Sequence, residues 1–228
     1  MSKTGDIYGG RNPAEIPAYT IAEASHWLGV PLSTTRAWLL GQGRFQPVVE
    51  IADTASKTLS FRNLVELHVL AAIRRKHKVS LQRVRPAMSF MESRLGVAHP
   101  LASARMLTDG RDLLVEWCGE YLNVSKSGQG EMRELLRAYL DRVEHDESGL
   151  ATRLYPFSRK DVLEDPRSIV IDPHIEFGRP CLAGTGVPTA EIADRYKAGE
   201  SIASIAEDYG RSREQVEEAI RYELPLAA

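Results

Sequence analysis

The sequence has only two cysteines in 228 residues, and it lacks long apolar runs. Cys118 and Cys181 lie far apart, so the sequence supports neither a disulfide framework nor a cysteine-built zinc site. No apolar run approaches the ~20 residues that a membrane span needs, and the first ten residues lack the apolar block of a secretory signal. We therefore expect a cytoplasmic protein with reduced thiols.

The sequence also lacks the motifs that usually carry catalysis. In the glycine-rich segment 177–196, Thr189 stands where a dinucleotide-binding fingerprint needs its third glycine. Ala183 and Gly184 stand where a phosphate-binding loop needs a Gly-Lys pair, and Cys181 has no neighbouring histidine that would activate it. The six histidines show no metal-ligand spacing. We predict no catalytic residue, no metal site and no cofactor, and hence a protein that is not an enzyme.

Charge is distributed unevenly along the chain. Residues 1–95 hold thirteen Lys and Arg against seven Asp and Glu, whereas residues 96–165 hold nine against thirteen and residues 166–228 hold seven against eleven. A basic front is typical of a surface that meets phosphates, although a solvated surface of ordinary composition would also explain it. The acidic segments favour a basic protein partner over nucleic acid. We predict a mainly α fold with some β structure (α+β), divided into these three units.

The front unit shows the pattern of two short helices joined by a tight turn. Thr20 and Glu23 have the spacing of a capping box at the start of an amphipathic helix. The stretch "GVPLS" ends that helix, and we expect Ser33 to cap a second helix over residues 34–40 that Gly41 closes. This arrangement predicts a helix-turn-helix, although a helical corner in an ordinary fold would show the same pattern.

The second helix is the expected DNA-reading element. In a helix-turn-helix its N-terminal half enters the major groove, while Trp38 and Leu39 are expected to face the core. The stretch "VVEIADTASKTLSF" has two β-rich runs around a polar turn, which predicts a hairpin wing beside the groove. The candidate DNA-binding residues are Ser33, Thr34, Thr35, Arg36, Lys57 and Arg62.

Two further helices are expected in the front unit. The first begins near Leu64 and ends in a basic cluster made of Arg74, Arg75, Lys76 and Lys78. These residues either complement the helix dipole or contact phosphate. The second is predicted over residues 80–95, and Pro86 either bends it or marks its true start. At Thr34, Arg36, Trp38 and the pair Phe61-Arg62 the front unit resembles the MerR-like DNA-binding fold.

The sequence of the middle unit shows no catalytic or ligand-binding motif. Asp109-Gly110 lies between two alternating apolar runs within residues 104–117, which predicts a β-hairpin. Apolar residues at helical spacing from Met132 to Val143 predict a helix, and "TRLYPF" is typical of a strand. We expect an α+β connector.

The rear unit has three hydroxyl residues and two glycines at the spacing of helix ends. Thr189 is expected to cap a helix that Gly199 ends, Ser201 a helix that Gly210 ends, and Ser212 a third helix. These short amphipathic helices predict a homeodomain-like three-helix bundle. Because so small a core is marginal alone, the preceding extended arm is expected to pack against it.

This rear unit resembles the domain-of-unknown-function 433 family, which pairs an Asp-Pro arm and a Gly-Arg-Pro turn with a Gly-Thr-x-Val-Pro turn and a final Ala-Ile-x-Tyr. Gly186 stands where the family usually has an arginine. The matching positions are Ile171, Asp172, Pro173, Gly178, Arg179, Pro180, Gly184, Thr185, Val187, Pro188, Gly199, Ala219, Ile220 and Tyr222.

The resemblance implies a VapB-like antitoxin with a MerR-like front, paired with a PIN-like ribonuclease toxin. It implies that the chain inhibits the toxin by binding it and represses its own operon by binding operator DNA. Arg179 and Thr185 are the toxin-binding residues that we infer from it, and a homodimer is expected because helix-turn-helix proteins read two half-sites. The alternative is a stand-alone MerR-like transcriptional regulator that responds to a ligand.

Overall fold

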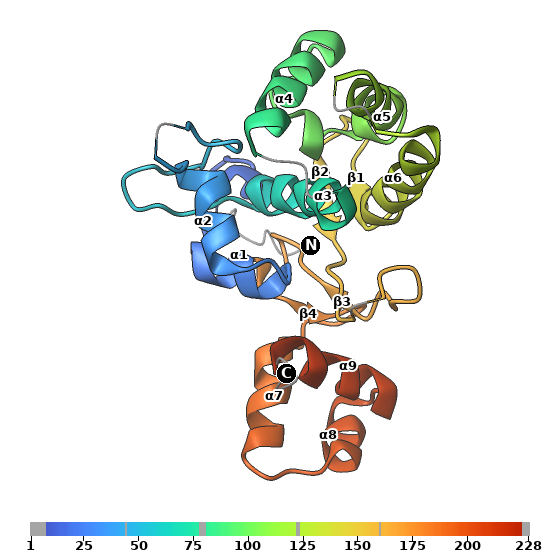
Figure 1. Ribbon diagram of the computed structural model, residues 1–228. Helices are drawn as coiled ribbons and strands as arrows, with labels where there is room; N and C mark the ends of the chain where they lie inside the picture. Colours follow the sequence, from blue (N-terminus) through green and yellow to red (C-terminus); the bar gives the residue numbers. More distant parts are fainter. Residues whose placement is uncertain (1–7, 44, 78–80, 122–123, 160, 225–228) are drawn as a thin grey trace.

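The computed structural model describes residues 8–43, 45–77, 81–121, 124–159 and 161–224. Helices make up most of this part of the chain, and it has two small two-stranded sheets, one beside the helices of the upper body and one just above the three rear helices (Figure 1). No helix in these ranges is long and apolar enough to cross a membrane. The predicted fold class, mainly α with α+β character, is confirmed.

The front unit contains the predicted helix pair. The capping box at α1 is confirmed, because the Thr20 hydroxyl accepts from the Glu23 amide (3.2 Å) and Glu23 accepts from the Thr20 amide (2.8 Å). The cap predicted for the second helix is wrong: Ser33 lies inside that helix, and Pro31 precedes it without a side-chain cap. Because the helix begins at Leu32, Ser33 occupies its second position and cannot serve as the N-cap. The helices are η1 (Pro13–Glu15), α1 (Ile21–Trp27), α2 (Leu32–Leu40), α3 (Phe61–His77) and α4 (Leu81–Leu95).

Helix α3 is the central helix of the fold and is buried on nearly every side from Phe61 to Leu70. It begins three residues before the predicted Leu64, because the Ser60 hydroxyl accepts from the Asn63 amide and Asn63 Oδ1 accepts from the Ser60 amide. Helix α4 contains Pro86, as predicted. Lys78 and Ser80 lie outside the described residues, and so do the side chains of the basic cluster Arg74, Arg75 and Lys76.

The predicted wing is shorter than a two-stranded hairpin. One bridge joins Asp53 and Thr58 around the turn 54–57, and a second bridge joins Leu59 to Tyr19 ahead of α1. The residues before Asp53 form no ladder, because the amides of Val48 and Val49 donate to the Trp38 carbonyl at the end of α2. The wing is therefore a tight turn, and the segment that leads to it is held against the end of α2.

The middle unit corrects one prediction. Asp109-Gly110 does not form a hairpin but begins helix α5, in which Leu114, Val115 and Cys118 are buried. The dipeptide favours a turn only where two strands can pair, and here α5 packs against α4 and α6 instead. Gly110 is required by close packing, since a Cβ there would lie 2.9 Å from Met106 Sδ. The elements are η2 (Pro100–Ala102), η3 (Ala104–Met106), α5 (Asp109–Tyr121), α6 (Lys126–Leu140), β1 (Val143–His145) and β2 (Ala151–Leu154).

Strand β2 links the middle unit to the rear arm. It pairs antiparallel with β1, and Leu154 also bridges Ile171 through two backbone hydrogen bonds of 3.0 and 2.8 Å. Asp172 then accepts from Arg153 on β2 (2.9 Å). The arm therefore continues the β structure of the connector. The helix predicted to reach Val143 ends at Leu140, because Val143 lies in β1.

The rear unit is the predicted arm followed by three short helices. The caps at Ser201 and Ser212 are confirmed, and Ser212 forms a capping box with Gln215. The cap predicted at Thr189 is wrong: its side chain is fully buried, and its hydroxyl bonds the Pro180 carbonyl and Glu223. The elements are β3 (Ile169–Val170), η4 (Glu176–Gly178), β4 (Cys181–Leu182), α7 (Thr189–Lys197), α8 (Ile202–Tyr209) and α9 (Arg213–Glu223).

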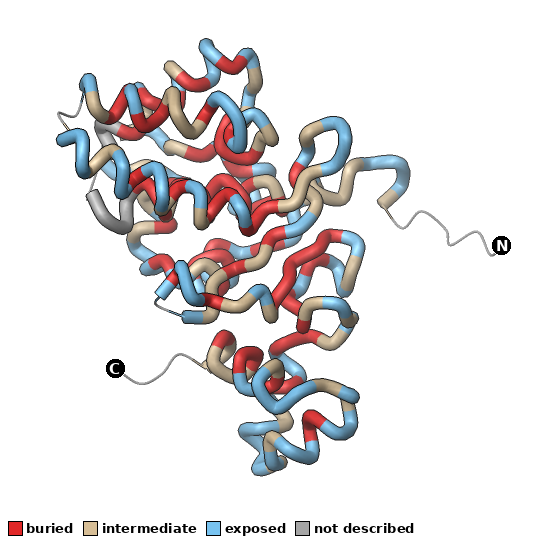
Figure 2. Tube along the Cα trace, turned by 90° about the vertical axis from the view of Figure 1, so that its right-hand side faces the viewer, coloured by how far each residue is buried: buried red, intermediate tan, exposed pale blue. Residues whose placement is uncertain are grey.

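The rear unit docks onto the front through the helix-turn-helix itself. The Tyr19 ring lies against Gly178, so closely that any Cβ at position 178 would overlap the tyrosine hydroxyl. His26 on α1 lies 3.5 Å from Glu223 on α9. Figure 2 shows that buried residues form a nearly continuous region through the upper units, whereas the three rear helices are buried mainly on their inner faces. The domain boundaries at residues 95 and 165 remain a prediction.

Candidate nucleic-acid interface

Helix α2 presents two of the four predicted DNA-binding residues to solvent. Ser33 and Arg36 are exposed and Thr34 is half-buried. The structure places Thr35 in the core with 1% exposure, where its hydroxyl donates to the Pro31 carbonyl (3.3 Å). Thr35 therefore has no route to a base edge in this conformation, and the exposed face of α2 carries Ser33 and Arg36 flanked by the exposed Leu32 and Leu40.

The opposite face of α2 packs against the core. Trp38 and Leu39 are buried, as predicted. Gly41 ends the helix with a φ of 78°, and a side chain there would collide with the Phe45 carbonyl, so the chain can reverse tightly toward the wing. Burial of Trp38 and Leu39 sets the rotation of α2 about its axis and so aims Arg36 outward.

The turn of the wing exposes a lysine side chain to solvent. Asp53 accepts from the amides of Ala55 and Ser56 and from the Ser56 hydroxyl, and these hydrogen bonds, led by the hydroxyl, lower the pKa of Asp53. Lys57 follows with a φ of 56° and is exposed. Lys57 thus stands at the tip of a turn whose shape its neighbours determine.

Arg62 is less available than Lys57. It is the second residue of α3 and forms an ion pair with Glu15 of η1, which leaves its side chain 26% exposed. Among the described residues, no hydrogen bond or ion pair links Arg62 or Lys57 to Arg36. Helix α2 and the wing turn therefore present Arg36 and Lys57 to solvent, whereas Arg62 is held by Glu15.

The rear arm carries the two predicted toxin-binding residues in different settings. Arg179 is exposed, directly after Gly178. Thr185 donates its hydroxyl to the Leu182 carbonyl (2.8 Å) and accepts from the Val187 amide (3.0 Å), so it shapes the loop that it occupies.

Beside Arg179, Phe177 is 70% exposed and has a φ of 55°. Left-handed backbone is uncommon for a side chain of this size and is often found at functional sites. Sequence reasoning missed Phe177, because a lone phenylalanine in a sequence favours burial and nothing local signals its exposure.

The two thiols are not arranged for nucleophilic chemistry. Burial raises the pKa of Cys118 to about 11, and burial with the nearby Glu176 carboxylate does the same for Cys181. Both thiols are therefore protonated at neutral pH and unreactive. No group of three or more potential metal ligands occurs within the described ranges.

These features define a helix-turn-helix protein of the DNA-binding class with an added rear module. A family model described as a "Putative DNA-binding HTH domain" matches residues 17–88, and the model described as "Protein of unknown function (DUF433)" matches residues 169–222. The two matches fall on the helix pair with its wing turn and on the arm with its three helices.

Full-length relatives identify the family. The "Putative antitoxin VapB45" of Mycobacterium tuberculosis is 31% identical over 230 residues, covering 90% of this chain and 93% of that protein. The chain belongs to the family of this antitoxin. The "Uncharacterized protein Rv2308" of the same organism is 30% identical over 219 residues, covering 90% of this chain and 89% of that one.

A solved structure shares the whole arrangement. The X-ray crystal structure of Rv2018 from Mycobacterium tuberculosis is similar to this chain with a TM-score of 0.69 and 28% identity, and the similarity covers 90% of this chain and 98% of that one. The likeness therefore extends through the connector as well as the front and rear modules.

Proposed function

We propose that this chain is the antitoxin of a type II toxin-antitoxin system. It binds and inhibits a PIN-like ribonuclease toxin, and as a cytoplasmic homodimer it represses its own operon by binding operator DNA, without catalysing a reaction. The observation that carries the DNA-binding part is the exposure of Ser33 and Arg36 on the N-terminal half of α2, together with that of Lys57 in the wing turn. The likeness to an antitoxin along nine-tenths of the chain supports the toxin-binding part.

Arg36 is the residue that we assign to base or phosphate contact. Its guanidinium is exposed on the N-terminal half of α2, where helix-turn-helix proteins contact base edges. Arg36→Ala is expected to weaken binding to the DNA upstream of the gene by ~1 to 3 kcal/mol. Fluorescence anisotropy at two salt concentrations measures it, since loss of a phosphate contact also flattens the salt dependence.

The matched control is Arg213→Ala, which removes an exposed arginine from the start of α9 in the acidic rear bundle. We expect its affinity for DNA to equal that of the wild type. An Arg36→Ala affinity that is unchanged, or a larger loss in the control, would move the DNA-binding surface to the rear helices.

Phe177 and Arg179 form the surface that we assign to the toxin. PIN-like nucleases gather carboxylates around Mg²⁺, and an arginine fork is the strong partner for a carboxylate. An exposed aromatic residue beside it is typical of an interface anchor. The pair projects from η4 on a backbone fixed by the contact between Gly178 and Tyr19.

Co-expression with the product of the neighbouring reading frame tests this assignment. The wild-type chain is expected to co-purify with that product and to abolish its ribonuclease activity. Phe177→Ala and Arg179→Ala should each weaken the complex by ~2 kcal/mol or more, whereas Arg213→Ala should not. No complex with the wild-type chain would reject the antitoxin assignment, and unaffected complexes of both variants would reject only the surface.

A second candidate, a stand-alone regulator that responds to a ligand, is favoured by a cavity behind the recognition helix. The gene neighbourhood separates the two, because only the antitoxin requires a toxin gene beside it.

A further inference from the structure

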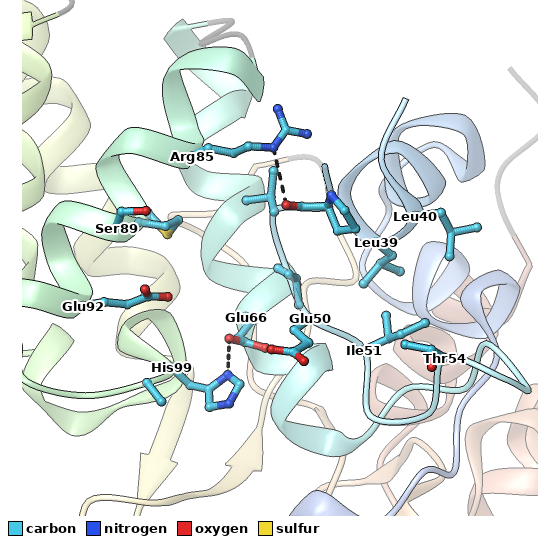
Figure 3. A pocket seen from close by; sticks show the side chains of 15 residues that line it. Leu39, Leu40, Glu50, Ile51, Thr54, Glu66, Arg85, Ser89, Glu92 and His99 are labelled. Carbon is cyan, nitrogen blue, oxygen red and sulfur yellow. Dashed lines mark hydrogen bonds and ion pairs between the residues drawn. The ribbon is translucent and has the colours of Figure 1, made fainter. Parts of the chain in front are cut away.

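A cavity of about 530 Å³ lies between the recognition helix, the wing segment and α4 (Figure 3). The end of α2 and residues 47–51 form one wall, and the turn of α4 that carries Met88, Ser89 and Glu92 forms the other. Glu66 of α3 and His99 close the bottom. The volume falls in the range of small-molecule sites, roughly 300 to 1,000 Å³.

The walls of the cavity combine apolar surface with carboxylates. Leu39, Val48, Ile51 and Met88 supply the apolar part. Three glutamates supply the charge: Glu50, Glu66 and Glu92. In Figure 3 the carboxylates of Glu50 and Glu66 lie close together, while Glu92 lies on the opposite wall. The cavity lining is thus mixed, with apolar side chains from both walls, a buried glutamate at the bottom and two exposed glutamates at the margin.

The positive groups at the cavity are engaged by the protein itself. Arg85 donates to the carbonyls of Gln46 and Pro47 and lies over the Phe45 ring. His99 Nδ1 lies 2.9 Å from Glu66 Oε1, while Asn63 donates to the other oxygen of Glu66 (3.0 Å). Glu66 is therefore satisfied.

Glu50 and Glu92, in contrast, form no ion pair within the described part of the chain. Both are exposed residues at the margin of the cavity. Two carboxylates beside an apolar space attract a ligand with a positive end and an apolar body, and they repel anions.

We propose that this cavity binds a small organic cation: an aliphatic amine whose chain packs between Leu39, Ile51 and Met88 and whose ammonium group pairs with Glu50 and Glu92. The cation is chosen over a metal ion because a metal needs several oxygen ligands, and no group of three or more potential ligands is placed to hold one in the described part of the chain. The inference does not depend on toxin binding.

Because of its position, a ligand bound in this cavity changes the affinity of the protein for DNA. A ligand here contacts the last turn of α2 and the segment that leads to the wing turn, the two elements that set the orientation of Arg36 and Lys57. A bound ligand therefore changes the affinity for operator DNA by the ratio of the ligand's affinities for the DNA-bound and the free arrangements of the protein. Bound DNA changes the affinity for the ligand by the same factor.

Three six-carbon probes test the site: hexylamine, hexanol and hexanoate, each titrated into the full chain at pH 7 and followed by NMR shifts and thermal stability. We expect saturable binding of hexylamine with a Kd on the order of 1 mM, and a rise in Tm that follows mass action. Hexanol is expected to bind more weakly, and hexanoate not at all. Equal binding of all three probes, or no saturable binding of hexylamine, would overturn the proposal.

Matched variants locate the binding. The double variant Glu50→Gln/Glu92→Gln should weaken hexylamine roughly tenfold, since two partly exposed ion pairs are lost. The double variant Glu207→Gln/Glu217→Gln removes the same charge from exposed positions of the rear helices and should leave the Kd unchanged. Ser89→Trp should block the cavity from its exposed margin with little risk to the core. Equal effects of both double variants, or hexylamine binding that survives Ser89→Trp, would show that the cavity is not the site.

Discussion

The front and rear modules are both mainly helical, but different forces hold them. In the front, α3 buries its own apolar side chains in the core, and Leu64, Leu67 and Leu70 have no exposed surface. In the rear, short capped helices surround a thin core, and buried polar groups join them to the arm. The front is therefore stabilised mainly by burial, and the rear by burial together with specific hydrogen bonds.

The polar part of the rear module is concentrated on Glu218 of α9. This carboxylate is 3% exposed and accepts from Ser158 (2.6 Å), from Arg159 (2.9 Å) and from Arg221. Burial acts to raise its pKa, but these hydrogen bonds outweigh burial and hold the pKa below the ordinary value. The comparison teaches that a module too small to supply a large core docks through directed contacts.

The largest expected effect comes from the front core. Leu67→Ala should lower the free energy of unfolding by about 4 kcal/mol, because the fully buried side chain leaves a cavity in the central helix. Ile205→Ala on α8 should cost about 2 kcal/mol, since the thin bundle can close around the gap. Urea unfolding measures both. Equal losses would erase the distinction between the modules, and Leu163→Ala, at a 60% exposed site, provides the baseline.

A smaller loss is expected at the junction of the modules. Gly178→Ala introduces a Cβ into the space of the Tyr19 hydroxyl at a φ of 78°, and should cost about 3 kcal/mol. Gly184→Ala has a φ of 75° and no atom within 4 Å of its added Cβ, so it should cost only the conformational part, about 1 kcal/mol. Thermal unfolding compares them, and similar shifts in Tm would mean that the contact with Tyr19 contributes nothing.

Removing the charge of Glu218 should have a smaller effect again. Glu218→Gln is expected to destabilise the chain by ~1 to 2 kcal/mol, because the partly exposed arginines regain water when the carboxylate is lost. Hydrogen exchange should show the loss first in the amides of α9. Exchange that accelerates evenly through α3 would contradict docking by local polar contacts.

The smallest effect is a pH dependence in the front module. The hydrogen bond to Glu66 raises the pKa of His99 above the ordinary 6.5, against the opposing effect of burial. Protonated His99 therefore stabilises the fold fully below pH 6.5, and this contribution is lost as pH rises through the folded pKa.

Because the imidazole is partly exposed, and Arg62 and Glu50 also influence it, we expect less than about 1 kcal/mol. His99→Gln should flatten the stability profile between pH 6 and 8, as measured by urea titrations at each pH. A variant profile as steep as the wild type would assign the pH dependence to another group.

The sequence predicts those parts of the fold that depend on neighbours along the chain. The capping boxes at Thr20 and Ser212 are formed as expected because donor and acceptor lie three residues apart. The Asp109-Gly110 hairpin is wrong because packing of α5 against two helices outweighs a two-residue turn preference.

The sequence indicates where the helix pair lies along the chain, but not which of its polar side chains face the core. Thr35 and Thr189 are polar residues at helix starts, and only the placement of neighbouring elements shows that both point into the core. The contact between His99 and Glu66 joins residues 33 apart, and spacing of that kind leaves no periodic signal. The exposed position of Phe177 likewise depends on a backbone conformation that its residue type disfavours.

The tyrosine that lies on Gly178 limits how the two modules can be recombined. A designer who grafts the rear module onto another DNA-binding head must carry over a tyrosine equivalent to Tyr19 and the bare glycine together, since neither surface is complete without the other. The same contact ties the arm of the rear module to the residues that lead into α1, so exchanging either module alone would leave a gap or a clash at this junction.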